Sequence, residues 1–364
     1  MNMSATVTES TSLPQREAQH HAVTFTGNGR EYFGIWIVNV LLSIVTLGIY
    51  SAWAKVRRMQ YFARNTQIDG ASFDYHGDPK AILKGRLIAF ALFALYQFAS
   101  VAHPFLGLGV AIALAGVMPA LLLRSLRFRL YNLSYRGLRF HFSGSMKEAY
   151  LAFLAWPLAV VLSVGLLLPM FQQRLKRFQH RNSAFGQTPF SFNASVKSFY
   201  WVYLQAVGLA LAALVLIGGL AFVVAFSSSL LGGDNASLQK QHFVLFASLV
   251  PIIFILLIWI VLQPFMAARM QNLIWRHTAL SDHRFDSRVS AGTLFGIHLT
   301  NLLLMIVTLG FYRPFAVARL YRYQAEAITL IASGTLDDFI AANTQGPGAT
   351  GDEMAEMFDI DIAL

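Results

Sequence analysis

Two pairs of polar side chains interrupt otherwise apolar stretches of the sequence. Asn39 and Thr46 lie seven residues apart in one stretch. Asn301 and Thr308 repeat that spacing in another. Seven residues are close to two helical turns, so each pair projects from one helix face. Polar groups in hydrocarbon need partners, so the pairs predict either hydrogen bonds between helices or a polar patch lining a substrate path.

Ionisable candidates are few. His298 stands where the first stretch has Trp36, and it is either an interfacial or core histidine with a satisfied hydrogen bond or a proton carrier. Five arginines follow apolar runs at matching positions: Arg57, Arg124, Arg174, Arg269 and Arg319. They predict anchoring at lipid headgroups or helix ends, with specific binding of an anionic lipid or metabolite as the alternative.

No set of residues points to a reaction. The sequence has no cysteine and no pattern of a zinc protease, a nucleophile elbow or a phosphate loop, and His20 and His21 stand in a polar N-terminal stretch. Carboxylates are nearly absent from the apolar runs, which disfavours a proton relay. We therefore expect no catalytic, cofactor-binding or metal site, and no enzyme.

The elements that carry these residues are apolar helices. The chain has 364 residues, of which 56% are hydrophobic and 13% are charged, whereas soluble domains carry about 25% charged residues. Crossing a membrane takes about 20 apolar helical residues. The sequence predicts an all-α polytopic membrane protein with about seven hydrophobic helical segments, at Gly34 to Trp53, Leu87 to Ala102, Phe105 to Leu123, Tyr150 to Met170, Trp201 to Phe226, Phe243 to Phe265 and Leu294 to Tyr312.

Similar sequence stretches recur along the chain. Phe33 to Tyr50 matches Phe295 to Tyr312 at 12 of 18 positions with a constant offset of 262. Both stretches contain "TLG", whose Gly48 or Gly310 can close a helix in the left-handed conformation. A new amphipathic helix then begins, of the kind that lies in the headgroup layer. We expect degenerate repeats with interfacial amphipathic helices, and a tight helical hairpin or one kinked helix where "HP" at His103 joins the second and third segments.

Short alternating stretches follow the first four amphipathic helices. They read "SFDYHG" at 72–77, "RFHFSG" at 139–144 and "PFSFNA" at 189–194, with a weaker "RFDSR" at 284–288. "TFTGNG" at 24–29 takes the matching place before the first segment. Alternation with period two predicts short strands. These FxF strands either pair into a small β-sheet beside the membrane or form independent turns.

The distribution of charge conflicts with seven alternating crossings. Four basic stretches carry seven, six, five and four Lys or Arg residues, at 53–86, 124–147, 171–200 and 266–292. The positive-inside rule assigns all four to the cytoplasm. Full crossing by every segment is the default interpretation, and it breaks the rule on one side. In the alternative, the first, fourth and seventh segments dip in and return.

Three regions are expected along the chain. Residues 1–22 form a disordered polar tail, 23–334 a membrane domain built from repeats, and 335–364 a mobile acidic tail that could recruit a partner protein. The net charge of +10 gathers beside apolar runs. It therefore predicts membrane lipids with anionic headgroups as partners and no nucleic acid.

The stretch from Phe25 to Gly77 resembles the YjgN family of bacterial inner-membrane proteins of unknown function. Its most specific part is "TLGIYSAWAKVR", and the likeness extends over about Val23 to Leu330. The resemblance implies a multi-pass protein of the bacterial inner membrane. It implies no substrate, cofactor or catalytic residue.

The leading functional hypothesis is a protein that moves or binds a small or lipidic solute through its helix bundle, because internal repeats are frequent in transporters. The alternative is a non-transporting envelope scaffold that binds anionic lipid and a partner protein. A continuous polar cavity reaching Asn39 and Asn301 would favour transport, and a dry bundle would favour the scaffold.

Overall fold

The computed structural model describes residues 18–231 and 259–344. The strands are β1 (Ala18–Ala22), β2 (Thr24–Phe25), β3 (Thr66–Ile68), β4 (Ala71–Tyr75), β5 (Leu133–Tyr135), β6 (Leu138–Phe142), β7 (Ser183–Phe185), β8 (Thr188–Phe192), β9 (Thr278–Leu280), β10 (His283–Ser287) and β11 (Ile328–Ser333). The helices are α1 (Gly29–Val45), α2 (Ser51–Arg64), α3 (Pro79–Ala102), α4 (Pro104–Tyr131), α5 (Met146–Tyr150), the π-helical turn η1 (Leu151–Ala155), α6 (Trp156–Leu162), α7 (Leu168–Arg181), α8 (Val196–Leu231), α10 (Ala291–Val307), α11 (Arg313–Glu326) and α12 (Leu336–Thr344). Residues 259–276 are also helical.

The described strands form one antiparallel sheet that is nearly closed into a ring. Their order is β1-β11-β10-β9-β8-β7-β6-β5-β4-β3-β2. The two end strands, β1 and β2, are neighbours in the chain and are separated only by Val23. The Val23 N–H donates to the Ile328 carbonyl at 3.0 Å, which continues the pairing of β1 with β11. A ring of this kind leaves no long sheet edge unpaired.

The alternating aromatic residues place their side chains on the inner face of the ring. The first aromatic residues of β4, β6, β8 and β10 lie in a row around the inside of the ring, with neighbouring ring centroids 6.3 to 6.4 Å apart. The row consists of Phe73, Phe140, Phe190 and Phe285. In the first three strands the second aromatic, two residues on, is on the same strand face and packs in the buried clusters under the helices. The FxF strands thus belong to one sheet, as predicted, but they do not pair with one another: a short strand lies between each two of them, and the sheet is much larger than predicted.

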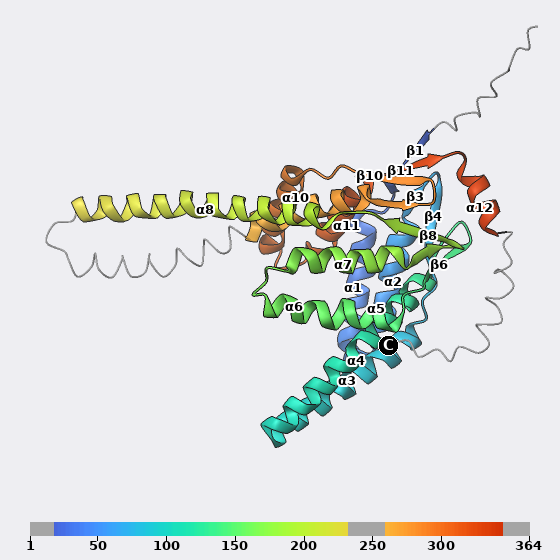
Figure 1. The fold of residues 1–364 in the computed structure, drawn as a ribbon, viewed down its shortest axis with the longest axis horizontal. Helices are drawn as coiled ribbons and strands as arrows, with labels where there is room; N and C mark the ends of the chain where they lie inside the picture. Colours follow the sequence, from blue (N-terminus) through green and yellow to red (C-terminus); the bar gives the residue numbers. More distant parts are fainter. Residues whose placement is uncertain (1–17, 232–258, 345–364) are drawn as a thin grey trace, which may run out of the picture.

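Five helical excursions leave the ring and return to it. They are α1 with α2, α3 with α4, α5 through α6 with α7, α8 with the helix over residues 259–276, and α10 with α11. Each follows one strand of the ring and leads into the strand that comes next along the chain. In Figure 1 the ring and α12 lie at one end of the molecule, and α8 and the α3–α4 pair project away from it.

Three of these excursions reverse through the same turn. Leu47 and Gly48, Val164 and Gly165, and Leu309 and Gly310 are consecutive residues with positive φ, near 50° and then near 90°. The glycine N–H bonds back to the carbonyl five residues earlier, at 2.7 or 2.8 Å. Glycine suits this position because its φ is costly for other residues. The predicted helix-closing role of Gly48 and Gly310 is confirmed.

The prediction of an all-α protein with about seven spanning segments is wrong. Within 18–231 and 259–344, three helices are long and apolar enough to cross a membrane: Pro79–Ala102, Pro104–Tyr131 and Val196–Gly219. The first, fourth and seventh predicted segments each contain a reversal and return to the ring. The sixth, Phe243 to Phe265, lies mostly outside the described residues. The second and third segments form the predicted hairpin, in which Gly107 allows close approach to Ser100.

Some predicted boundaries also differ from the structure. Strand β1 lies within the stretch predicted as an N-terminal tail, and α12 lies within the predicted acidic tail. Prolines take two kinds of position in the helices that return to the ring. Pro169 and Pro314 stand in the first turn of α7 and α11, whereas Pro119 lies inside α4 and Pro264 within the helix over residues 259–276.

Candidate functional site

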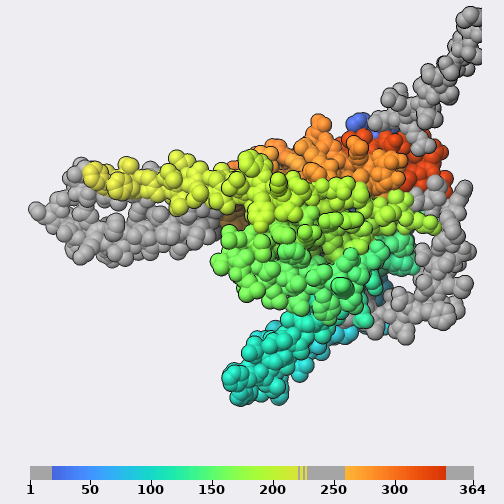
Figure 2. Space-filling model, in the orientation of Figure 1, coloured from blue at the N-terminus to red at the C-terminus, as the bar shows by residue number. Residues whose placement is uncertain are grey.

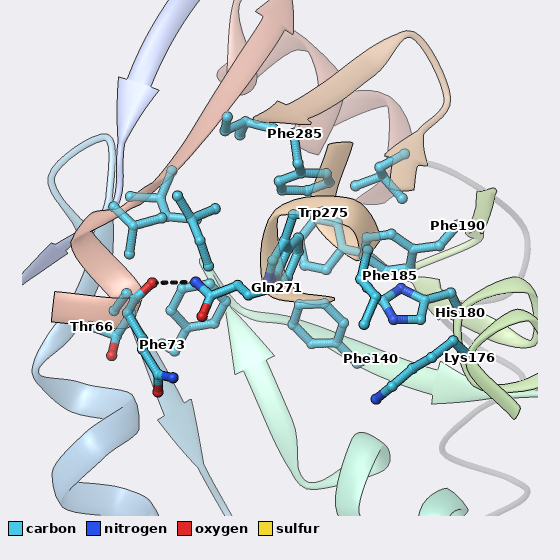
Figure 3. A pocket seen from close by; sticks show the side chains of 18 of the residues that line it. Thr66, Phe73, Phe140, Lys176, His180, Phe185, Phe190, Gln271, Trp275 and Phe285 are labelled. Carbon is cyan, nitrogen blue, oxygen red and sulfur yellow. Dashed lines mark hydrogen bonds between the residues drawn. The ribbon is translucent and has the colours of Figure 1, made fainter. Parts of the chain in front are cut away.

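A cavity of about 1050 Å³ lies inside the ring of strands. Ligand pockets of drug-sized molecules usually measure about 300 to 1,000 Å³, so this cavity is large. One wall is the row of phenylalanines from the FxF strands. The opposite wall comes from three helices, α7, α11 and the helix over residues 259–276. Figure 3 shows Trp275 among the aromatic side chains that surround the space.

The cavity extends from the ring toward the reversal of the third excursion. Its lining on α7 runs from Phe171 to His180, about 14 Å along the helix axis. On the helix over residues 259–276 it runs from Gln263 to Trp275. The Phe171 end of α7 follows the exposed apolar turn at Val164, which is 91% exposed. The apolar space therefore reaches from the strands toward the part of the molecule with exposed apolar side chains.

Two basic side chains, Lys176 and His180, interrupt this apolar lining from α7. Both point into the space in Figure 3. The Lys176 amine donates to Gln179 Oε1 at 3.3 Å. Burial lowers the pKa of Lys176, and the nearby Arg129 lowers it further. Among the described residues that line the cavity, none carries a carboxylate.

His180 is the most strongly perturbed titratable group of the site. Burial, and then the charge of Lys176, lower its pKa from 6.5 to about 4. Its imidazole stacks on Phe192 with centroids 5.3 Å apart, and Nδ1 lies 3.2 Å from Thr278 Oγ1. At neutral pH the imidazole is therefore uncharged, and Lys176 supplies the positive charge of this wall.

Helix α12 covers one side of the cavity. Leu336, Phe339 and Ile340 belong to the lining, and the Phe339 ring meets the His283 ring edge-on with centroids 4.6 Å apart. Outside the cavity, Arg136 pairs with Asp337 of α12 and with Asp69, whose Oδ2 lies 2.7 Å from the guanidinium. The same helix thus contributes apolar contacts inside and a surface ion pair outside.

Two of the polar residues singled out from the sequence, Thr46 and Thr308, cap turns. Each hydroxyl donates to the carbonyl four residues earlier and accepts the N–H of the residue four positions later, Tyr50 or Tyr312. In the reversal of the third excursion, Ser163 makes a similar pair of bonds: its hydroxyl donates to the Val160 carbonyl, three residues earlier, and accepts the Leu167 N–H. The threonines therefore satisfy backbone groups of the reversals, and neither lines the ring cavity.

The two asparagines lie apart from the ring cavity. Asn301 Nδ2 donates to the Ala316 carbonyl of α11 at 3.3 Å, which is an interhelical hydrogen bond of the predicted kind. Asn39 lines a separate groove of about 630 Å³, whose described lining includes four cations and no carboxylate. The four cations are Lys55, Arg58, Arg86 and Arg313. His298 is half-buried on α10 and lines neither space, so the five residues do not form one site.

The five matching arginines lie on the returning arm of each excursion and outside the ring cavity. Three guanidinium groups lie over aromatic rings at 5.6 to 5.8 Å, which satisfies cation-π geometry. These are Arg57 over Tyr50, Arg174 over Trp156 and Arg269 over Phe265. Arg319 donates to Thr300 Oγ1 at 2.9 Å, and Arg124 is exposed on α4. Headgroup anchoring by these residues stays a prediction.

Sequence reasoning missed Lys176 and His180. In "QQRLKRFQHR" they look like part of the solvated face of a basic amphipathic helix. The signal that could have found them is their spacing, because Gln172, Lys176 and His180 recur every four residues and share one helix face. The opposite wall comes from strands that the sequence predicted by their alternation, although no cavity was predicted there.

Comparisons with known proteins agree with the resemblance seen in the sequence. The profile of a family described as "Bacterial protein of unknown function (DUF898)" matches residues 20–357. The chain is 28% identical over 157 residues to a Salmonella typhimurium protein named "Inner membrane protein YjgN", over 43% of this chain and 40% of that protein. Two Escherichia coli proteins of the same name, from O157:H7 and K12, are 29% identical over 154 residues, 42% of this chain and 39% of each.

The matched part thus spans about two-fifths of the length of these relatives. No solved structure matches the chain. Because the family profile covers nearly the whole chain, the chain belongs to the family of bacterial proteins of unknown function DUF898, whose curated relatives here are inner membrane proteins.

Proposed function

We propose that this chain is a multi-pass inner-membrane protein that binds a lipidic molecule in the ring cavity, without catalysing a reaction. The observation that carries the proposal is the cavity itself, a space of about 1050 Å³ lined mainly by aromatic and aliphatic side chains. A site of this size and lining suits a long apolar ligand, since binding would remove apolar surface from water.

The outer surface supports residence in a membrane. Large apolar side chains are exposed along α3, α4 and α8, and Leu47 and Leu309 at two reversals are 94% and 88% exposed. Apolar patches of this extent mark surfaces that contact lipid or protein. Figure 2 shows α8 and the α3–α4 pair as two arms that leave the body of the molecule. The inner-membrane relatives support the same location.

The shape of the cavity favours a lipidic ligand over a small polar solute. If the protein transported a polar solute, we would expect a continuous polar cavity that reaches Asn39 and Asn301. In the described part of the chain, Asn39 lines a groove separate from the ring cavity, and Asn301 lines neither. The ring cavity extends instead along α7 toward Phe171, near the exposed apolar turn, which offers a lipid a route from the bilayer.

The basic groove beside Asn39 supports a second candidate, a scaffold that holds anionic lipid at its surface. Lys55, Arg58 and Arg313 are exposed there. Arg86 is the last basic residue of α3 before its apolar surface, which begins at Leu87. The boundary between basic residues and apolar surface on a membrane helix is where lipid headgroups contact cationic side chains. The two candidates differ in where the lipid lies, and a variant that fills the ring cavity separates them.

The test is an Ala325→Trp variant, which places an indole in the cavity from α11. Ala325 is 8% exposed and belongs to the lining. Native mass spectrometry of the protein purified in mild detergent should find one lipidic molecule retained by the wild type, and at least about tenfold less in the variant, a loss of ~1.4 kcal/mol. Ala113→Trp, on the exposed surface of α4, is the matched control and should retain the ligand.

Equal retention by the Ala325→Trp and Ala113→Trp variants would contradict binding in the ring and favour the surface groove. The melting temperature of the Ala325→Trp variant should match that of the wild type, since the indole occupies existing space.

A further inference from the structure

We propose that Lys176 is the anchor for an acid group, so that the ligand of the ring cavity is an anionic amphiphile with a carboxylate or phosphate on a hydrocarbon chain. This inference names the ligand class for the proposed function and rests on it. It depends on where one charge lies within an apolar space.

The first step is the position of the amine. Lys176 is on the inner face of α7, and its side chain points into the cavity beneath Phe140 in Figure 3. It belongs to the same wall as Leu175, one residue earlier, and Phe171, near the end of α7 that follows the reversal. A ligand chain lying along this wall would bring one of its ends within reach of the amine.

The second step is the lack of a counter-ion in the described part of the chain. Lys176 forms no ion pair there, and its hydrogen bond goes to a neutral amide, that of Gln179. None of the described lining residues is Asp or Glu. A partly buried ammonium group without an opposite charge is costly, and an anion beside it would remove much of that cost.

The third step is the local field. The positive charge of Arg129 on α4 acts on Lys176 through space and adds to the positive potential at the amine. His180, one helical turn further along α7, is neutral at pH 7 and can donate or accept a hydrogen bond without adding charge. The wall therefore attracts one anionic group and offers it a polar neighbour, while the phenylalanine row opposite accepts the chain.

The experiment compares ligands that differ only in the head. A fluorescent polyene fatty acid, its methyl ester and the phosphate monoester of the corresponding polyene alcohol are titrated against the full chain in neutral detergent. The wild type should bind the fatty acid or the alkyl phosphate about tenfold more tightly than the ester, which corresponds to ~1.4 kcal/mol. The tighter of the two anions identifies the acid group.

The matched variants are Lys176→Met, Lys176→Arg and Lys147→Met. Methionine keeps the length of the side chain and removes the charge, so it should preserve the fold and the affinity for the ester while removing the preference for the anions. Lys176→Arg should retain the preference. Lys147 is exposed on α5 outside the cavity, so its variant should behave as the wild type does.

Each remaining outcome has one meaning. If the wild type binds the ester and the anions equally, or if the Lys176→Met variant keeps the preference, the inference about Lys176 is wrong and the proposed cavity function stands. If the wild type binds none of the three chains, the proposed function itself is wrong. If inorganic phosphate alone binds as tightly as the alkyl phosphate, the hydrocarbon chain is not part of the ligand and the amphiphile is rejected.

Discussion

Several polar side chains have structural roles that differ from those predicted from their sequence context. Thr46 and Thr308 are polar residues at the ends of apolar helices, yet each caps a reversal by bonding to backbone atoms on both sides of it. Lys176 and His180 stand in a basic helix, yet they line the apolar cavity. Whether a polar side chain serves the backbone or a ligand depends on what lies across from it, and the local sequence does not contain that information.

The titration of His180 makes the stability of the ring dependent on pH. Its pKa is lowered to about 4, whereas an unfolded histidine titrates near 6.5. The folded protein therefore binds fewer protons than the unfolded chain between these pH values. The contribution of the neutral His180 to the free energy of unfolding is fully present above pH 6.5 and is lost as the pH falls toward 4. At ~1.4 kcal/mol per pKa unit the loss is on the order of 3 kcal/mol. The lowered pKa of His283 acts in the same direction.

Chemical unfolding in detergent at several pH values between 7 and 4 measures this loss. The His180→Gln variant should show a clearly smaller dependence on pH than the wild type over that range, because glutamine keeps a hydrogen-bonding side chain and does not titrate. The same slope in both proteins would show that another group governs the pH dependence.

At the scale of elements, local patterns predicted some pieces well. The FxF stretches have the period of a strand, and each forms one, because the alternation places aromatic side chains on the inner face. Their partners were not predicted. Strands such as β3 and β5 have three residues and no aromatic alternation, and they exist because they pair with a neighbour across a turn.

The number of crossings was predicted wrongly for a physical reason. An apolar run was taken as one helix of about 20 residues, but the run from Gly34 to Trp53 contains the reversal at Leu47 and Gly48. The turn residues are themselves apolar and highly exposed, so the hydropathy does not fall where the chain reverses. The positive φ of Leu47 and Gly48 and the capping by Thr46 distinguish the turn, and of these the sequence indicated only the helix-closing role of Gly48.

Helix α12 covers the cavity through apolar side chains, of which Phe339 makes the ring contacts. The Phe339→Ala variant should lose its ring contact with His283, which costs about 2 kcal/mol for a half-buried phenylalanine. Hydrogen exchange of the α12 amides should then be about 30-fold faster while α11 is unchanged. In Asp337→Asn, which breaks an ion pair whose carboxylate side chain is 87% exposed, the change should stay below about fivefold. Equal effects in both variants would contradict the packing role of Phe339.

At the scale of the whole molecule, the ring explains the charge distribution that conflicted with seven crossings. Every excursion starts and ends at the ring, so the described parts of the four basic stretches lie on the ring side of the arms. The seven, six, five and four basic residues of these stretches then agree with the positive-inside rule if the ring faces the cytoplasm. The conflict arose because the first, fourth and seventh apolar runs were each taken as one crossing.

The position of the ring can be measured directly, because the chain has no cysteine. Single cysteines replace Gln187 and Asp282, exposed at two strand turns of the ring, and His103, exposed where α3 meets α4. With a membrane-impermeant maleimide, the His103→Cys variant should react in intact cells, and the Gln187→Cys and Asp282→Cys variants only after permeabilisation. Labelling of Gln187→Cys in intact cells would mean that the fourth apolar run crosses the membrane, and a ring of strands on one side of the bilayer would be contradicted.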